Sequence, residues 1–445
     1  MTSRDAILSE IEAQGIRFVE LWFTDIMGVV KSVTIPVTRL ETTMENGSHF
    51  DGSSVDGFAR VAESDMVLRP DLETFVVLPW HSNPEARTAR LICDVYTPQG
   101  EPFIGDPRGA LVRMLQEAEA QNLRFKTGME MEFFLFHLDA EGRPLLSTPY
   151  DEASYFDITT DQAQGIRREM MLALESMGIP VNSAHSEIGP GQHEIDFEYD
   201  DALRTADRMV TARVAMKAVA QHKGLHCTFM PRPRTDLPGS GMHTHQSLHD
   251  VATDENLLAD ANHEYGLSDL ARHFLAGQLC HARGMAAVIA PLVNSYKRLG
   301  TSVEAPVYVS WAHINRSALI RIPSVTPGKE AHTRLELRAP DPSANPYLAS
   351  AVMLGAGLDG INQQMALPDP LEETLLMQNR SRLRQVEALP HTLGEALDAM
   401  EQDDVILSAL GPYISDRYLT AKRQEFEAYK QTVSQWEIER YINKY

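Results

Sequence analysis

The run Phe-Lys-Thr-Gly-Met-Glu-Met-Glu-Phe-Phe-Leu-Phe at residues 125–136 places two glutamates, Glu130 and Glu132, inside a largely apolar segment. The pattern predicts a β-strand, so both carboxylates are expected on one face and the intervening apolar side chains on the other. Two neighbouring carboxylates repel each other and lose hydration, and they are tolerated only where a cation, a proton or water compensates. A solvated strand face with no special role is the alternative for this segment taken alone.

Three later segments repeat this arrangement of polar and apolar side chains. Their polar groups are Glu187 and Glu194 around a Gly-Pro-Gly turn, then His243, His245 and Ser247, and finally Arg334, Glu336 and Arg338. A sheet with helices on its apolar side would gather these groups on one concave polar face, where we expect the site.

Glutamates with a histidine form a hard, oxygen-rich ligand set, which suits Mg²⁺ or Mn²⁺ better than structural zinc. Five arginines offer planar cationic groups for carboxylates and phosphates: Arg298, Arg316, Arg321, Arg334 and Arg338. A metal ion with arginines is the equipment of phosphoryl transfer. The sequence has neither a GxxxxGK[ST] loop nor a GxGxxG turn after a strand, so the nucleotide must be held in another way.

The chain of 445 residues exceeds one ordinary hydrophobic core, and we expect a small domain and a large one. A segment rich in proline and glycine at residues 98–107 ends in Asp106 and Pro107, an N-cap followed by a residue suited to the first helical turn. We place the boundary in this segment, with residues 1–103 as a small sheet domain and residues 104–445 as the larger domain.

The net charge of the chain argues against certain classes of partner, and its cysteines indicate the redox compartment. With 40 basic and 62 acidic residues the net charge is −22, which argues against nucleic acid or an anionic membrane as a partner. No apolar run approaches the ~20 residues that span a bilayer, and the first 14 residues predict an amphipathic helix rather than a signal peptide. Cys93, Cys227 and Cys280 have no CxxC spacing, which indicates free thiols in a reducing cytoplasm.

Local patterns predict the remaining elements. Strands are expected at residues 16–24, 29–36, 75–78 and 89–95, and helices at residues 108–122, 160–177, 345–358 and 416–434. Thr160 or Asp161 is the expected cap of the second helix, and Thr392 has capping-box spacing for another. The last ten residues, rich in aromatic side chains, would either pack on the body or dock on a neighbouring subunit.

Six short motifs, each weak alone, occur in one order along essentially the whole chain. They are Asp51-Gly52-Ser53-Ser54, Glu130-Met131-Glu132, Gly191-Gln192-His193-Glu194, Gly239-Ser240-Gly241-Met242-His243, Asn315-Arg316-Ser317-Ala318 and Arg334-Leu335-Glu336-Leu337-Arg338. On these residues the chain resembles a class I glutamine synthetase, of the subgroup without adenylylation, or a close γ-glutamyl-amine ligase paralogue. The resemblance implies an α+β fold: an N-terminal β-grasp domain and a catalytic half-barrel of antiparallel strands covered by helices. It also implies a dodecamer of two hexameric rings, with active sites between subunits.

The resemblance implies a role for each matching position. Glu132, Glu187 and Glu194 would hold one Mg²⁺ or Mn²⁺ ion, and Glu130, His243 and Glu336 a second. Glutamate would contact Arg298, Arg338 and the backbone of Gly239, and ATP would contact His245, Ser247, Arg321 and Arg334. Arg316 would stabilise the transferred phosphoryl group, and Asp51, Ser54, Tyr155, Glu187 and Glu304 would form the ammonium pocket.

The implied reaction is the ATP-dependent ligation of ammonia to the γ-carboxylate of L-glutamate through γ-glutamyl phosphate. Asp51 would help to deprotonate the bound ammonium ion, and Glu304 would lie in a loop at residues 295–306 that closes over the intermediate.

Two departures from the family pattern stand out. Pro238 occupies the position where the family usually has asparagine beside the glutamate-binding glycine, and no tyrosine lies between Leu371 and Leu389, where adenylylation would occur. One alternative is therefore a γ-glutamyl ligase for a larger amine, such as a polyamine, ethanolamine or methylamine. The other is a non-catalytic nitrogen sensor, which would be expected to lose metal ligands or the phosphoryl arginine; this chain keeps both.

Overall fold

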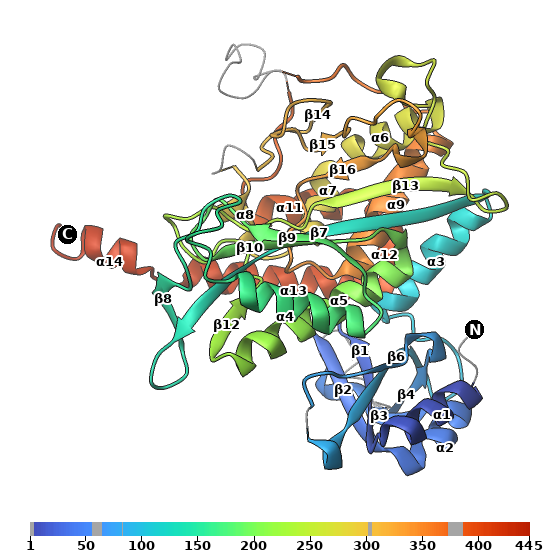
Figure 1. The fold of residues 1–445 in the computed structure, drawn as a ribbon. Helices are drawn as coiled ribbons and strands as arrows, with labels where there is room; N and C mark the ends of the chain where they lie inside the picture. The colour runs from blue at the N-terminus through green and yellow to red at the C-terminus, as the bar shows by residue number, and fades with distance from the viewer. Residues whose placement is uncertain (1–3, 56–64, 82, 301–304, 373–385) are drawn as a thin grey trace.

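The computed structural model describes residues 4–55, 65–81, 83–300, 305–372 and 386–445 (Figure 1). The small N-terminal domain is built on one sheet and two helices. Its strands are β1 (Phe18–Thr24), β2 (Val30–Pro36), β3 (Ser48–Asp51), β4 (Asp65–Pro70), β5 (Val76–Val77) and β6 (Thr88–Tyr96), with α1 (Arg4–Gln14) and α2 (Leu40–Asn46). The strand order is β2-β1-β6-β4-β3, and β5 also pairs with β6.

The central pair of this sheet, β1 and β6, is parallel, and the other neighbours are antiparallel. The amphipathic N-terminal helix was predicted correctly, because α1 buries Ile7 and Ile11 against the sheet. Strands β3 and β4 were not predicted. They are short, and nothing in their local pattern distinguishes them from loop.

The larger domain is organised around β7 (Leu123–Leu138), the strand with the paired glutamates. The other strands are β8 (Pro144–Pro149), β9 (Val181–Ser186), β10 (Gln192–Phe197), β11 (Asp200–Asp201), β12 (Leu225–Thr228), β13 (Thr244–Asp250), β14 (Trp311–Ala312), β15 (Ile320–Arg321) and β16 (Leu335–Leu337). The order is β14-β15-β16-β13-β7-β10-β9, with β8, β11 and β12 also paired to β7. Apart from the β14–β15 pair, the strands are antiparallel, as the half-barrel prediction requires.

Helices cover the apolar face of this sheet (Figure 1). They are α3 (Pro107–Glu119), α4 (Gln164–Ser176), α5 (Ala202–His222), α6 (Asp269–Cys280), α7 (Ala282–Ile289), α8 (Ser295–Arg298), α9 (Pro346–Asn362), α11 (Leu393–Glu401), α12 (Asp404–Leu410) and α13 (Pro412–Gln431). A further helix, α14 (Gln435–Tyr441), follows α13 and buries none of its residues. Met129, Met131 and Phe133 of β7 are completely buried in the core beneath them. The alternation along β7 therefore leaves Glu130 and Glu132 on the opposite face.

Two of the three predicted helix caps are confirmed. Asp106 and Thr392 accept backbone hydrogen bonds at the starts of α3 and α11, and Asn345 does the same at the start of α9. The cap predicted for α4 at Thr160 or Asp161 is wrong, because the helix begins at Gln164 after Ala163. Asp161 instead forms a buried ion pair with Arg167, one turn into the helix.

A buried arginine joins the two domains. Arg108 at the start of α3 pairs with Asp71 and Asp94 of the small domain, at 2.7 and 2.6 Å, and with Asp207 of α5 at 2.9 Å. The hydroxyl of Tyr347 donates to Asp207 at 2.7 Å. One cationic group thus holds three carboxylates from both sides of the domain boundary.

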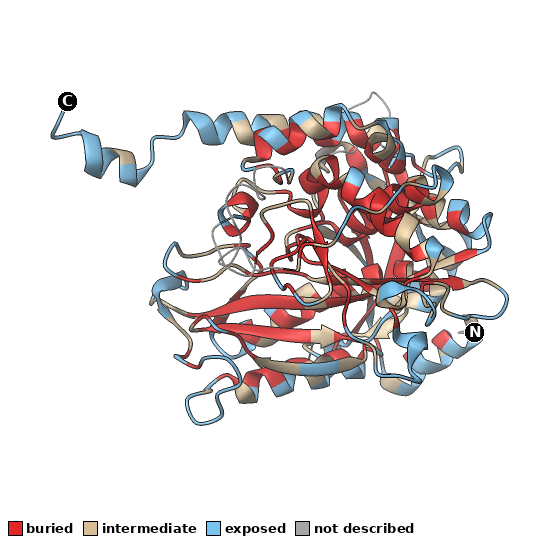
Figure 2. Ribbon diagram, turned by 90° about the horizontal axis from the view of Figure 1, so that it is seen from above, coloured by how far each residue is buried: buried red, intermediate tan, exposed pale blue. Residues whose placement is uncertain are grey.

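The C-terminal segment leaves the body of the molecule. Figure 2 shows α14 exposed along its length and separated from the helices that cover the core. Trp436 and Ile442 are 58% and 68% exposed. All three cysteines are free, as predicted, with Cys93 and Cys227 buried and Cys280 exposed. Among the described residues, no helix is both long and apolar enough to cross a membrane.

Candidate active site

Strand register aligns the polar side chains predicted from the sequence. Glu194 of β10 lies opposite Glu132 of β7, and Asp196 lies opposite Glu130. On the other side of β7, the amide of Glu130 donates to the carbonyl of His243 at 3.0 Å, and His245 pairs with Glu336 of β16. The groups converge because directly opposed residues on neighbouring strands share one face of the sheet.

The first cluster on this face consists of Glu130, His243 and Glu336. Each offers one ligand atom, and these atoms all lie within 4.8 Å of one another. Nδ1 of His243 is 3.1 Å from Oε2 of Glu130 and 3.9 Å from Oε1 of Glu336. Burial opposes ionisation of Glu130, but hydrogen bonds from His243 and His245 outweigh it and hold the pKa of this carboxyl well below its usual value.

A second cluster lies on the neighbouring strands and contains His185, Glu194 and Asp196. Nε2 of His185 is 3.3 Å from Glu194, and its Nδ1 is 3.6 Å from Glu187. Burial and then the charges of Glu132 and Asp196 raise the pKa of Glu194 far above that of a free glutamate. The negative charges of these carboxylates are therefore not fully balanced by the neighbouring protein groups.

Glu336 is 1% exposed and lies between two arginines. It accepts hydrogen bonds from Arg321 and from Arg338. Nε of Arg338 is buried and has no hydrogen-bond partner within the described part of the chain. One N–H of the arginine predicted to bind glutamate therefore has no acceptor among the described residues.

Arg298 explains why the nearby motif contains glycines. Its guanidinium is bound to the carbonyls of Arg338 and Ala339 at 3.0 and 2.8 Å. A Cβ on Gly241 would lie 2.5 Å from Nη2 of Arg298, and a Cβ on Gly239 would lie 2.7 Å from its Cγ. Only glycine lets this backbone approach the buried arginine so closely.

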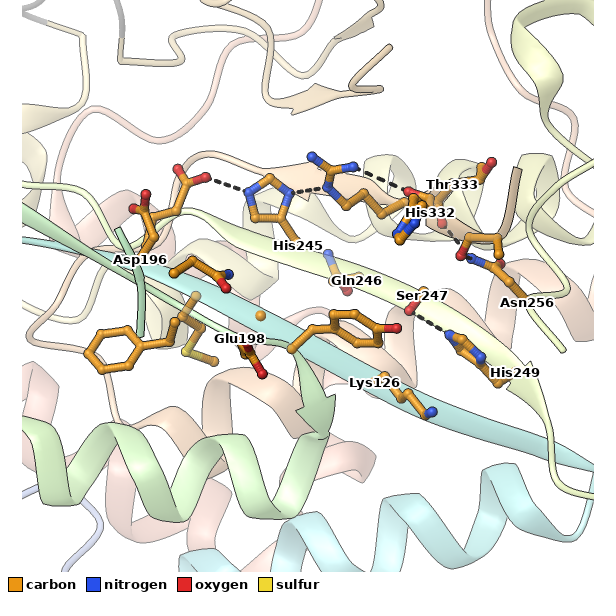
Figure 3. A pocket seen from close by; sticks show the side chains of 18 residues that line it. Lys126, Asp196, Glu198, His245, Gln246, Ser247, His249, Asn256, His332 and Thr333 are labelled. Atoms are coloured by element: carbon orange, nitrogen blue, oxygen red, sulfur yellow. Dashed lines mark hydrogen bonds and ion pairs between the residues drawn. The ribbon is translucent and has the colours of Figure 1, made fainter. Parts of the chain in front are cut away.

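A cavity of about 570 Å³ adjoins the first cluster (Figure 3). Glu130, Asp196, His245, Ser247 and Arg334 are among the residues that line it. His245, labelled in Figure 3, lies between Arg334, whose Nε donates to Nδ1 at 3.2 Å, and the Glu130 carboxylate, 2.6 Å from its Nε2. Three of the four predicted nucleotide contacts therefore line one cavity, while the fourth, Arg321, is bound to Glu336.

Tyr155 and Arg316 approach the same face from loops. Burial and then the charges of Glu187 and Glu194 raise the pKa of the Tyr155 hydroxyl, and a hydrogen bond with Arg316 opposes this shift. The ring of Tyr155 lies 5.5 Å from the ring of His185. Both predicted residues thus lie at the edge of the second cluster.

Two predicted residues are not brought to this face within one chain. Asp51 is in β3 and Ser54 in a short turn, both in the small domain, which Figure 1 places away from strands β7 and β10. The Asp51 side chain accepts a hydrogen bond from the amide of Ser53 at 2.9 Å. Glu304 lies outside the described residues.

Sequence reasoning missed His185, Asp196 and Gln192 as members of the site. Asp196 stands two positions after Glu194 on the same strand, so the alternation that identified the other carboxylates was already present. Gln192, two positions before Glu194, carries the same signal. The position of His185 depends on how β9 pairs with β10.

Comparison with known proteins agrees with this arrangement. Family sequence models described as "Glutamine synthetase, beta-Grasp domain" and "Glutamine synthetase, catalytic domain" match residues 15–98 and 104–441. The chain belongs to the glutamine synthetase family.

Relatives within this family span the whole chain. The glutamine synthetase of Halobacterium salinarum is 46% identical over 443 residues, with 99% of this chain and 96% of the relative covered. That of Thermus thermophilus is 47% identical over 445 residues, covering 99% and 98%. Among solved structures, the chain titled "GmaS/ADP complex-Conformation 1" has a TM-score of 0.87 at 33% identity, with both chains fully covered.

These relatives establish the reaction class. The protein is a glutamate-ammonia ligase that forms ADP, as the catalytic-domain match and the full-length glutamine synthetases indicate. Enzymes of this family act on small molecules and use ATP and divalent metal ions. The class I assignment and the α+β fold with a β-grasp domain are confirmed.

Proposed function

We propose that glutamine synthesis takes place on the polar face of the large sheet, with one metal site at the first cluster and another at the carboxylates that adjoin the second cluster. Glu130, His243 and Glu336 would hold one divalent ion, and the convergence of their ligand atoms within 4.8 Å is the observation that carries this proposal. Glu132, Glu187 and Glu194 would hold a second ion. Carboxylate oxygens with one imidazole suit Mg²⁺ or Mn²⁺.

The crowding of charge on this face supports the metal assignment. Glu132, Glu187 and Glu194 are between 7% and 8% exposed, and the charge of Glu132 is among the causes that raise the pKa of Glu194. A bound divalent ion would remove that repulsion, and in the reaction it would neutralise charge on the phosphates of ATP. The residues present therefore fit two metal ions.

The arginines would bind the anionic parts of the substrates. Arg298 and Arg338 would hold L-glutamate beside the backbone of Gly239. Arg334, His245 and Ser247, with Arg321, would hold ATP in the adjoining cavity. Arg316, at the edge of the site, would stabilise the phosphoryl group as the γ-carboxylate of glutamate attacks it.

The ammonium pocket would combine residues from two subunits. Glu187 and Tyr155 lie at the second cluster, whereas Asp51 and Ser54 belong to the small domain of the same chain. We therefore assign Asp51 and Ser54 to the site of a neighbouring subunit, with Asp51 accepting a proton from ammonium. Glu304 would complete the pocket from the loop at residues 295–306.

An assembly of subunits would also cover the C-terminal segment. Residues 433–445 expose aliphatic and aromatic side chains, and a helix as short as α14 gains little stability on its own. We propose that this segment docks on a neighbouring subunit in a dodecamer of two hexameric rings. Free thiols suit a reducing compartment, and we place the reaction in the cytoplasm.

A larger amine is a second candidate acceptor. The ring of Phe156 is 65% exposed and lies 4.9 Å from that of His185, so apolar surface borders the carboxylates that would receive ammonium. Pro238 also replaces the asparagine that the family usually has in this region. Both features would suit an acceptor with an alkyl group, although neither removes a residue of the ammonium pocket.

The decisive assay measures ADP release by the full-length protein with ATP, L-glutamate and Mg²⁺. Ammonium would be compared with methylamine, ethanolamine and a polyamine, and products would be identified by mass. We expect ammonium to give the highest specificity constant; a large preference for one organic amine would overturn the choice of acceptor.

Variants would test the site in the same assay. Glu132→Ala and Arg316→Ala are expected to lose most ADP release, and undiminished activity in either would contradict its assignment. Glu141→Ala and Arg143→Ala are matched controls, because these two residues form an exposed pair in the turn after β7. Both controls should retain full activity.

A further inference from the structure

Gln192 is a buried glutamine at the first position of β10, and none of the roles assigned above involves it. It is 1% exposed. The backbone N–H of Gln192 donates to the backbone carbonyl of Gly189, and the backbone carbonyl of Gln192 accepts from the backbone N–H of Glu187, both at 2.8 Å. The tight turn between β9 and β10 therefore fixes the backbone from which this side chain projects.

The side-chain amide of Gln192 bonds to two groups of the site. Nε2 donates to Oε2 of Glu132 at 3.1 Å and to the carbonyl of Gly239 at 3.0 Å. An ionised carboxylate and a carbonyl can only accept, so the opposite orientation of the amide would place oxygen against two oxygens. Both N–H groups of Gln192 are thus engaged, one with each partner.

This bridge influences how Glu132 presents its carboxylate. Oε2 also accepts from the amide of Gly241 at 3.0 Å, so two donors hold this one oxygen. The other oxygen, Oε1, lies 3.8 Å from Nε2 of His243. Gln192 and Gly241 therefore hold Oε2 of Glu132, and Oε1 is left on the side of His243 in the first cluster.

The same bridge restrains the segment that would bind glutamate. The backbone N–H of Ser240 donates to the carbonyl of Pro231 at 2.7 Å, and Arg298 packs against Gly239 and Gly241.

Within the described residues, Oε1 of Gln192 is buried without a hydrogen-bond partner. A Cβ on Gly189 would come within 2.8 Å of both this oxygen and Cγ of Pro238, which has no N–H to offer. Keeping an unpaired buried oxygen here costs stability, which argues for a functional reason to keep the glutamine.

We propose that Gln192 is a positioning residue that couples metal binding at Glu132 to glutamate binding at Gly239. The proposal rests on the roles given to these two residues under the proposed function. A metal ion that orders Glu132 also orders the Gln192 amide and, through it, the Gly239 carbonyl. Because coupling between two sites is reciprocal, bound glutamate strengthens metal binding by the same factor.

The test titrates the full-length protein with Mn²⁺ in the absence of ATP, with and without saturating L-glutamate, and follows free Mn²⁺ by electron paramagnetic resonance. The wild-type protein should bind Mn²⁺ more tightly when glutamate is present. Gln192→Met keeps the length of the side chain and removes its donors, and we expect about ten-fold weaker Mn²⁺ binding. Glutamate should no longer change the Mn²⁺ affinity of this variant.

A matched control is Gln278→Met in α6. Gln278 is completely buried, and its Nε2 donates to Gln246 and to the carbonyl of Met353 at 2.6 and 3.0 Å, while its Oε1 accepts from Gln246 at 3.1 Å, so this variant loses at least as many hydrogen bonds as Gln192→Met. We expect this control to lose stability but to keep the effect of glutamate on Mn²⁺. If it loses that effect as Gln192→Met does, the bridge is not the cause and the proposal fails.

Other outcomes separate this proposal from the assignment of the site. Glutamate-dependent Mn²⁺ binding that persists in Gln192→Met would overturn the coupling while leaving the metal site intact. Unchanged Mn²⁺ affinity in Glu132→Ala would instead overturn the metal site itself. Should Gln192→Met fail to fold, Gln192→Glu, which keeps the shape and replaces the donating nitrogen with oxygen, is expected to show the same loss of coupling; retained coupling there would refute the proposal.

Discussion

Nε2 of His245 lies 2.6 Å from Oε1 of Glu130, while Nδ1 of the same ring lies 3.2 Å from Nε of Arg334. An arginine can only donate, so Nδ1 must be the acceptor and Nε2 must carry the proton that points at Glu130. One imidazole therefore joins a predicted metal ligand to a predicted nucleotide-binding arginine.

Replacing this imidazole should affect both sites together. In His245→Gln a flexible amide replaces the rigid ring whose two nitrogens contact Glu130 and Arg334, so we expect the KM for ATP and the dissociation constant for Mn²⁺ each to rise about ten-fold. Steady-state kinetics and Mn²⁺ titration measure the two effects. His226→Gln on β12, outside the site, is the control. A rise in only one of the two constants would contradict the shared role of His245.

Because Arg298 lies so close to the backbone, we expect that Gly241 cannot be replaced by a larger residue without loss of activity. In Gly241→Ala the new methyl group would lie 2.5 Å from Nη2 of Arg298 and 2.9 Å from Nε2 of His243, so both must shift. We expect kcat/KM for glutamate to fall at least ten-fold because a small displacement of positioning groups is costly. Gly165→Ala in α4, where nothing lies within 4 Å, should be neutral or slightly stabilising. Wild-type kinetics in Gly241→Ala would contradict this prediction and show that the backbone shifts to make room for the methyl group.

His281 predicts a pH-dependent contribution to stability. It lies between α6 and α7, with Nδ1 2.9 Å from Asp403 and Nε2 3.0 Å from Asp359. Burial lowers its pKa, but the hydrogen bonds that its ring donates to Asp403 and Asp359 outweigh burial and leave the pKa raised. A raised folded-state pKa gives a contribution that is complete below the unfolded value of about 6.5 and is lost as pH rises through the folded value.

The comparison of wild type with His281→Gln checks this contribution. We expect the variant to melt at a lower temperature at pH 6, with a loss of about 1–3 kcal/mol for hydrogen bonds to a charged group. The difference in melting temperature should shrink as pH rises toward 9, as differential scanning fluorimetry would show. A difference that stays constant across this range would mean that the imidazole does not carry a proton in the folded protein.

The exposed C-terminal segment predicts an effect on assembly rather than on folding. Deleting residues 433–445 removes an apolar surface that the isolated chain leaves in solvent, so sedimentation velocity should show smaller assemblies with an unchanged far-UV spectrum. Trp436→Ala with Ile442→Ser should act in the same direction. Gln435→Ala with Glu439→Ala changes polar residues of the same helix and should leave assembly intact. Full-size assemblies after deletion would place this segment outside the contacts between subunits.

Local patterns along the chain accounted for most of the secondary structure and for the polar face. Alternation with period two is a property of the strand itself, so Glu130 and Glu132 could be assigned to one face before any partner strand was known. Caps such as Asp106 and Asn345 are also local, because the side chain bonds to a backbone amide two or three residues ahead. The cap predicted for α4 failed because Asp161 has a stronger partner in Arg167.

The tertiary structure alone decided which of these groups meet. The register between β7 and β10 places Glu194 against Glu132 and Asp196 against Glu130, and a shift of one residue would turn one set to the opposite face. Gln192 enters the site through the same pairing, and Arg108 meets three carboxylates only because two domains pack together. The residue types and their spacing therefore determined the chemistry available to this protein. Long-range strand pairing and domain packing, which no local pattern encodes, decided how its groups are arranged.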